Sequence, residues 1–282
     1  MAQTVDGDRA GRVPALALRR TVVEQTAPVR RLVVTDANPY DQSSYRVRFG
    51  WGPEGLDTLA STVDVCIIID VLSFTTSVDI ALGRGAVIFP YRWHDGSEYR
   101  FAESVEAEVA SRPGESKGFS LRPASLAQVP AGLRLVLPSP NGSALSFGAA
   151  EAGASTVVAA CLRNGAAVGS VYADEDVTVG VIAGGERWGG TTGPMRVAVE
   201  DLYGAGAVLS MFDSADLSPE ALTAVAAWRE AEPDILARLR GCASGRQKAL
   251  RGFPEDVDLA AQAHVSELVP TLDGDHFVAG PI

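Results

Sequence analysis

Short apolar runs that alternate with helical patterns constrain the fold of this chain more than any other feature. The run VCIIID, at residues 65–70, is apolar up to its final aspartate, as is typical of a strand buried in a parallel sheet. A helical pattern follows over residues 75–84, and AVIFPY is the next strand-like run. Because such alternation is typical of a sheet covered on both faces, we predict an α/β fold, with three α/β/α layers and a largely parallel or mixed sheet.

The alternation extends over most of the chain. YRVRFGW, LRLVLP, STVVAAC and VTVGVIAGG are further predicted strands, and helical spacing is found over residues 97–112 and 195–212. From residue 218 to 262 the pattern is helical, with breaks near Glu232 and Gly241, and SELVPTL is a predicted late strand. We expect residues 1–30 to form a flexible N-terminal leader. Residues 31–282, which begin with strand-like RLVVTD, are expected to form a single α/β domain, which could consist of two merged α/β halves.

Charge and composition limit the partners and the location of the protein. The formal net charge of −11 makes a long basic surface improbable, so we expect no nucleic-acid partner. An acidic protein that binds an anion must gather positive charge locally, through arginine, helix N-termini or a metal ion. The longest apolar runs are strand-sized, which predicts no membrane contact, and the three separated cysteines suit a reducing compartment. We therefore expect a cytoplasmic protein, which could form a homo-oligomer.

Polar residues follow several of the predicted strands at the point where each strand ends. They are Asp70, Asn141, Asn164 and the pair Glu186–Arg187. If the strands are parallel, their carboxyl ends lie at one edge of the sheet, where open α/β sheets bind ligands. Each member also has a structural alternative: Asp70 could cap the next helix, and Asn-Gly turns suit the backbone alone.

Two adjacent acidic residues, Glu200 and Asp201, are set among apolar residues in a helical pattern. Adjacent helix positions lie about 100° apart, so at least one carboxylate should be near buried surface. A buried carboxylate needs a metal ion or an arginine, and Mg²⁺ usually takes one or two carboxylates with water and phosphate oxygens. Asp70 with one of these acids is therefore a candidate Mg²⁺ pair. The three histidines show no zinc-binding spacing.

Several segments, in their order along the chain, resemble the 2-phosphosulfolactate phosphatase family. They are IDVLSFTTSVDIALGRGA, PSPNGSALS, AACLRNGAAVG, IAGGERWGG…AVEDLYGAGA and FPEDVDLAAQAHVSELVPTL, and the likeness spans residues 60–272. The resemblance implies a Mg²⁺-dependent phosphatase that releases phosphate from a sulfonated 2-phospholactate. It implies three groups of site residues: catalytic Asp70, Asn141 and Asn164; substrate-binding Thr75, Thr76, Gly142 and Ser143; and metal-binding Asp70, Glu200 and Asp201. Asp70 would either bind Mg²⁺ or act as the nucleophile.

The sequence departs from the family pattern at three places. Ser73 stands where family members typically have arginine, Gly118–Ser125 reads GFSLRPAS in place of a GFDxxNSP-like loop, and Gly114–Glu115 is the nearest counterpart of an upstream Gly-Glu element. Serine cannot replace the bidentate bond of an arginine to an anion. We therefore predict that another arginine binds the substrate, chiefly Arg122 or Arg187, with Arg163 as the third candidate.

Two alternative functions remain open from the sequence. A haloacid-dehalogenase-like phosphatase is disfavoured, because its second aspartate would fall at Leu72. A catalytically weakened relative that binds an anionic ligand without turnover is favoured by Ser73 and the altered GFSLRPAS loop. A phosphatase assay with and without Mg²⁺ separates the enzyme from the binding protein.

Overall fold

A computed structural model describes Met1 and residues 38–92, 95–112, 118–189 and 193–280. The described residues from 38 onward belong to one compact unit, Asp36–Ile282. The expected leader, the strand predicted from RLVVTD and the Gly114–Glu115 element lie outside the described residues. The division into a leader and a single domain stays a prediction.

A mixed sheet forms the middle layer, and within the described residues it has nine strands in the order β1-β7-β2-β6-β10-β11-β3-β5-β4. The strands are β1 (Val47–Trp51), β2 (Val65–Ile69), β3 (Val87–Tyr91), β4 (Glu108–Val109), β5 (Arg134–Pro138), β6 (Thr156–Ala160), β7 (Val179–Ala183), β10 (Pro270–Asp273) and β11 (His276–Ala279). A separate ribbon pairs β8 (Glu186–Arg187) with β9 (Met195–Arg196).

The sheet consists of two parallel groups that run in opposite senses. β1, β7, β2 and β6 are parallel to one another, and so are β3, β5 and β4. The hairpin β10–β11 lies between the groups and is antiparallel to both neighbours, β6 and β3. Three antiparallel pairings in succession reverse the strand direction, so β5 runs opposite to β2.

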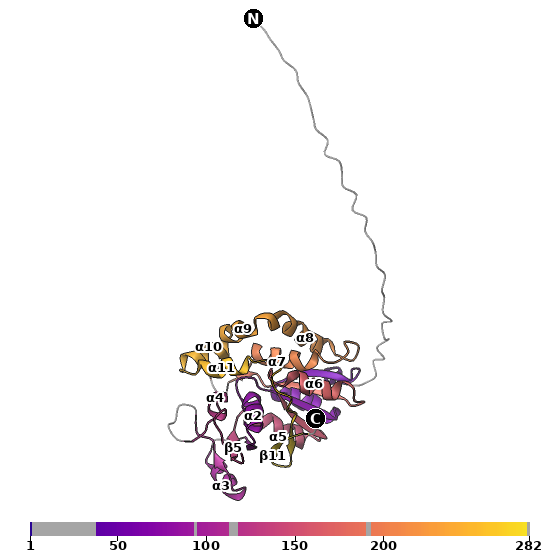
Figure 1. Cartoon of the computed structure of the whole chain (residues 1–282). Coiled ribbons are helices and arrows are strands. Elements are labelled where there is room, and N and C mark those ends of the chain that lie inside the picture. The colour runs from indigo at the N-terminus through magenta and orange to yellow at the C-terminus, as the bar shows by residue number, and fades with distance from the viewer. Residues whose placement is uncertain (2–37, 93–94, 113–117, 190–192, 281–282) are drawn as a thin grey trace. The chain divides into compact units, whose positions relative to one another are not determined.

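Helices cover both faces of the sheet, as Figure 1 shows for the orange-to-yellow α8–α11 on one side and α2 and α5 on the other. On β2, Val65, Ile67 and Ile69 pack with residues of α6, α7 and α8, whereas Cys66 and Ile68 pack with residues of α1 and α5. Burial on both faces explains why this strand is continuously apolar. The helices are α1 (Gly52–Leu59), α2 (Phe74–Gly83), α3 (Ser97–Ser104), α4 (Pro123–Leu126), α5 (Gly142–Glu151), α6 (Gly165–Ala173), α7 (Val199–Leu209), α8 (Pro219–Ala231), α9 (Ile235–Gly241), α10 (Ala243–Leu250) and α11 (Pro254–Ala260).

The predicted three-layer α/β fold with a mixed sheet is confirmed, and several single elements differ from the prediction. The helix predicted over residues 97–112 ends at Ser104, because Glu106 adopts a left-handed φ of 51° before β4 begins. The helix predicted over residues 195–212 begins at Val199, because Met195–Arg196 pair with Glu186–Arg187 as β9 and β8. These two short strands, β4 and β11 were not predicted from the sequence. In the part of the chain that the structure describes, no helix has the length and apolar character needed to cross a membrane.

Candidate active site

A cleft of about 660 Å³ opens beside Asp70 and is called the Asp70 cleft below. Its lining residues come from five regions of the sequence: the turn after β2, the segment before α4, the turn after β5, the β8–β9 ribbon, and α10 with the residue that follows it. They are Asp70, Leu72, Ser73, Leu121, Ser139, Pro140, Asn141, Glu186, Arg187, Trp188, Gly189, Arg196, Ala243, Gln247 and Arg251. The cleft therefore gathers three of the four strand-end sites that the sequence singled out.

Asp70 receives hydrogen bonds from the N-termini of two helices. Its Oδ1 accepts from Phe74 N, the first residue of α2, at 3.2 Å, and its Oδ2 accepts from Gly142 N, the first residue of α5, at 3.0 Å. Helix N-termini carry a partial positive charge and unpaired N–H groups, so both helices favour negative charge at this point. Asp70 thus also has the capping role that the sequence left open as its alternative.

The meeting of Asp70 and Asn141 does not arise from parallel strands. The expected common edge is wrong for β5, which runs opposite to β2. Five strand positions separate β2 from β5, and the contact arises because α5, which follows β5, packs back against β3, β6 and β2. The N-termini of α2 and α5 can then meet, because Gly142 has no side chain: a Cβ there would lie 2.3 Å from Cδ1 of Phe74.

The carboxyl group of Asp70 is buried, and its electrostatic surroundings favour the protonated form. Burial and the neighbouring Glu186 carboxylate raise the pKa of Asp70 to about 6, against the lowering effects of the two N–H donors and of Lys248. A carboxyl group that titrates near neutral pH in a cleft is a frequent feature of catalytic sites.

This raised pKa predicts a pH-dependent stability of the metal-free protein. The folded state binds the Asp70 proton more tightly than the unfolded state, so the contribution of Asp70 to stability is complete below about pH 4 and is lost as the pH rises through 6. We expect a loss on the order of 3 kcal/mol, since one pKa unit corresponds to about 1.4 kcal/mol. Urea unfolding in EDTA at pH 4 and pH 7 measures it, as the difference between the parent and Asp70→Asn. A difference that stays constant with pH contradicts the prediction.

Three predicted substrate-binding hydroxyl groups are buried and bonded to the backbone. Thr75 Oγ1 donates to the Asp70 carbonyl at 2.8 Å, Thr76 Oγ1 to that of Val71 at 2.7 Å, and Ser143 Oγ to that of Leu137 at 3.0 Å. All three residues are fully buried. Their hydroxyl groups stabilise the backbone of the turns that follow β2 and β5. Their contact with substrate stays a prediction.

Asp201 braces two of the turns that form the cleft. Its Oδ1 accepts from Val71 N at 2.8 Å and its Oδ2 from Gly185 N at 2.9 Å, which ties the turn after β2 to the turn after β7. Burial raises the pKa of Asp201 well above its usual range, and the charges of Glu200 and Asp70 add to this effect. Glu200 is equally buried, and its Oε2 has no hydrogen-bond partner among the described residues. Neither acid is among the residues that line the cleft.

Asn164 occupies the turn after β6 and is fully buried. Its Oδ1 accepts from Cys161 N at 2.8 Å, and its Nδ2 donates to the carbonyls of Ala159 and Leu268, both at 3.2 Å. These bonds attach the turn to the segment that leads into β10. The structure therefore does not bring Asn164 to the Asp70 cleft, and its catalytic role stays a prediction. Asn141, in contrast, lines the cleft and donates from Nδ2 to the Gly185 carbonyl at 3.3 Å.

Of the three predicted arginines, Arg187 alone lines the Asp70 cleft. Arg122 is paired with Glu255 and, at 3.1 Å, with Asp256, and it stacks on the Phe253 ring. Arg163 pairs with buried Asp79 at 2.8 Å and lines a separate cavity of about 320 Å³. Arg196 and Arg251, which the sequence analysis did not propose, join Arg187 in the cleft.

Lys248 and Asp256 were also missed. Lys248 Nζ donates to Ser73 Oγ at 2.5 Å, on the wall of the cleft, and lies 3.4 Å from the Oδ2 of fully buried Asp256. Burial lowers the pKa of Lys248, against the raising effect of the Asp256 carboxylate. Asp256 belongs to the segment FPEDVDLA. The only sign in the sequence that Asp256 is buried is its position among apolar residues in a helical pattern.

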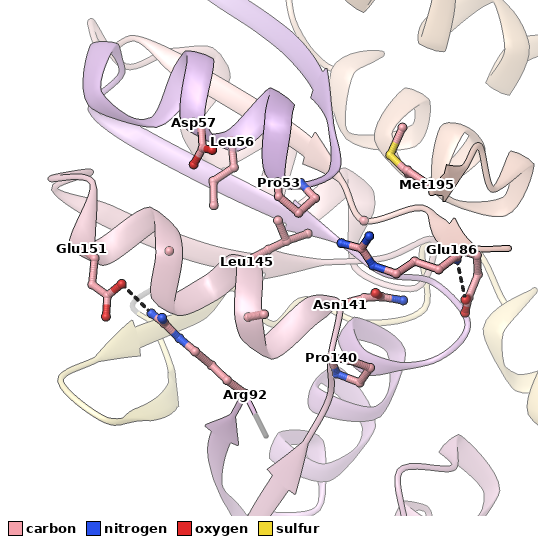
Figure 2. A pocket seen from close by; sticks show the side chains of 14 residues that line it. Pro53, Leu56, Asp57, Arg92, Pro140, Asn141, Leu145, Glu151, Glu186 and Met195 are labelled. Atoms are coloured by element: carbon pink, nitrogen blue, oxygen red, sulfur yellow. Dashed lines mark hydrogen bonds and ion pairs between the residues drawn. The ribbon is translucent and has the colours of Figure 1, made fainter. Parts of the chain in front are cut away.

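A smaller pocket of about 280 Å³ adjoins the cleft and shares Pro140, Asn141, Glu186 and Arg187 with it. Figure 2 shows Asn141 and Glu186 near one end of this pocket and Arg92 reaching Glu151 at the other, at 2.7 Å. The shared residues place the α5 N-terminus between the two hollows.

The carboxylates of the cleft are of the ligand type that Mg²⁺ binds. Within the described residues, no group of three or more His, Cys, Asp and Glu side chains is arranged to hold a metal ion. Mg²⁺ needs only one or two carboxylates when water and phosphate oxygens complete its shell. Asp70 and Glu186 both line the cleft, and their mutual repulsion favours a cation between them.

The fold and the site define an α/β enzyme whose cleft places a buried carboxyl group among arginines. The family model described as 2-phosphosulpholactate phosphatase matches residues 53–275. A probable 2-phosphosulfolactate phosphatase of Deinococcus radiodurans is 29% identical over 242 residues, which cover 78% of this chain and 92% of the relative. A protein of the same name from Pseudothermotoga lettingae is 25% identical over 223 residues, covering 76% and 92%. The chain belongs to the 2-phosphosulfolactate phosphatase family, a family of phosphoric monoester hydrolases, as the resemblance predicted.

Proposed function

We propose that this protein is a Mg²⁺-dependent phosphatase that hydrolyses a small anionic phosphomonoester such as 2-phospho-3-sulfolactate. The observation that supports this most is the position of Asp70, which lies at two helix N-termini in a cleft with three arginines. Helix N-termini and arginines both favour phosphate oxygens, and a carboxyl group beside them can act on the phosphorus centre. The named relatives support the same substrate class.

We assign different roles to different residues of the cleft. Arg187, Arg196 and Arg251 bind the anionic groups and neutralise charge that develops on the phosphoryl oxygens. As the nucleophile, Asp70 would displace the alcohol of the substrate and form an acyl phosphate, which water then hydrolyses to release phosphate. In the alternative role, Asp70 would hold Mg²⁺ together with Glu186, and Glu200 or Asp201 would complete the metal site. Mg²⁺, when bound, supplies a Lewis acid for the phosphoryl oxygens. Asn141 donates a hydrogen bond at the rim of the cleft. A cytoplasmic location and assembly into a homo-oligomer remain part of the proposal.

Phosphate release from a panel of phosphorylated small acids tests the proposal. We expect hydrolysis of compounds that carry a second acidic group, loss of activity in EDTA, and recovery when Mg²⁺ is added. Phosphomonoesters that carry no second acidic group serve as the comparison and should react more slowly. Activity that is unchanged by EDTA contradicts the Mg²⁺ requirement, and no phosphate release from any compound contradicts the phosphatase.

A binding protein without turnover is the second candidate, and Ser73 in place of the family's arginine favours it. Such a protein would bind inorganic phosphate or a phosphorylated acid in the cleft and release no phosphate from it. The same panel, together with a calorimetric titration of each compound, separates the two functions.

Arg187→Ala is expected to raise KM by about tenfold or more, because a charge-assisted hydrogen bond contributes about 1.5–3 kcal/mol. Arg163→Ala is the matched control. It removes the same charge from an ion pair outside the cleft, so it should change stability and leave KM near the parent value. Initial rates over a range of substrate concentrations measure both variants. Equal KM values for the parent and Arg187→Ala would remove Arg187 from the site.

A further inference from the structure

The ammonium group of Lys248 lies between a buried carboxylate, Asp256, and Ser73, which lines the Asp70 cleft. Asp256 is fully buried, and its oxygens accept from Arg122 Nε at 3.1 Å and Ala124 N at 3.2 Å and lie 3.4 Å from Lys248 Nζ. Lys248 belongs to α10 and Asp256 to α11, so the pair fixes the lysine side chain across two helices. The lysine is thereby held with its charge at the cleft wall.

Ser73 accepts a hydrogen bond from the ammonium group of Lys248, and Ser73 lines the cleft. Its Oγ accepts from Lys248 Nζ at 2.5 Å, and no acceptor for its O–H is found among the described residues. The ammonium has three N–H bonds, and Ser73 and Asp256 account for two of them within the same residues. One N–H of Lys248 and the hydroxyl proton of Ser73 are left to donate. Two donors with one positive charge, side by side at a cleft wall, suit an anionic oxygen.

We propose that Lys248, together with Ser73, binds one anionic group of the substrate in the Asp70 cleft. This rests on the proposed phosphatase function and deepens it. A lysine on α10 then supplies positive charge beside Ser73, in addition to the charge of Arg187 in the same cleft. The three arginines of the cleft then face a second anionic group, so the substrate class is a small molecule with two separate acidic groups.

Calorimetric titration of the purified protein with inorganic phosphate tests the role of Lys248. Lys248→Met keeps the length of the side chain and removes its charge, and we expect the Kd for phosphate to rise about tenfold or more. Arg246→Met is the matched control, because Arg246 is exposed on the same helix and, unlike Lys248, has no bond to Ser73 of the cleft wall. It removes the same charge and should leave the Kd close to the parent value.

A rescue variant separates anion binding from a structural role, since Lys248→Met also leaves Asp256 with one cation fewer. The double variant Ser73→Arg with Lys248→Met returns a positive charge to the cleft wall from the other partner. We expect it to bind phosphate more tightly than Lys248→Met alone. Thermal unfolding of all variants shows which of them remain folded, and Lys248→Arg provides a conservative second test if Lys248→Met unfolds.

The outcomes distinguish this inference from the proposed function. Equal phosphate affinity for Lys248→Met and Arg246→Met, or a parent that binds no phosphate, overturns the role of Lys248. A rescue variant no better than Lys248→Met also overturns it. If phosphate binding depends on Lys248 and the parent hydrolyses none of the test compounds, the inference holds and the phosphatase proposal fails.

Discussion

Replacing Asp70 with asparagine is expected to lower phosphate release by at least about 10³-fold, while the protein remains folded. Asparagine is neutral, so it can neither attack phosphorus nor hold Mg²⁺ at this position. Losses of this size are typical when a group at the centre of a reaction is removed. Steady-state rates with saturating Mg²⁺ measure the effect, and circular dichroism with a urea titration measures the fold.

The stability of Asp70→Asn should change by less than its activity. An amide offers one acceptor oxygen to the two N–H donors of Phe74 and Gly142, so one of these bonds is lost. At neutral pH the removal of a buried negative charge offsets part of this cost. A well-folded variant that retains activity would show that the chemistry takes place elsewhere in the protein.

Gly142→Ala should lower both the stability and the activity of the protein. The new Cβ would lie 2.3, 2.6 and 2.8 Å from Cδ1, Cγ and Cβ of Phe74, which is fully buried and has no free space to move into. Overpacking of this kind costs about 1–3 kcal/mol, and relief requires the N-termini of α2 and α5 to separate. That separation would break the Gly142 bond to Asp70, so we expect loss of activity along with the loss of stability.

Gly83→Ala is the control for Gly142→Ala. Gly83 also lies in a helix, and the only heavy atom that its Cβ would meet within 4 Å is Leu268 Cδ1, at an ordinary contact distance of 3.5 Å. Alanine is favoured over glycine in helices by up to about 1 kcal/mol, so this variant should be as stable as the parent or more stable. Urea unfolding and phosphatase rates of both variants provide the comparison. If the two alanine variants behave alike, the close approach at Phe74 has no functional importance.

The architecture was predictable because local patterns reported burial directly. Continuous apolar runs such as VCIII and VVAA occur in strands that are covered on both faces, and the breaks near Glu232 and Gly241 coincide with the ends of helices. The strand direction was not predictable. Each apolar run looks the same whether its neighbour is parallel or antiparallel, and the short β11 after a tight turn at Gly274 carries little signal of its own.

The site was predictable where a polar residue follows a buried strand, as at Asp70, Asn141 and Glu186. The site was not predictable where polar side chains form hydrogen bonds to the backbone inside the protein. Asn164 occurs in the same kind of turn as Asn141, yet its amide bonds three backbone groups inside the protein. Lys248 lies in an unremarkable polar helix, and only the tertiary pairing with Asp256 brings its charge to Ser73.

The strands at the centre of the sheet are the last to be synthesised among the strands that the structure describes. β10 and β11 join β6 to β3, and both follow every other described strand in chain order. During synthesis, the strands of both parallel groups are therefore made before residues 270–279. Until those residues are available, the edges of β6 and β3 have no strand to pair with. Open strand edges are where incompletely folded chains associate wrongly, so β6 and β3 are the edges most exposed to aggregation until this hairpin joins them.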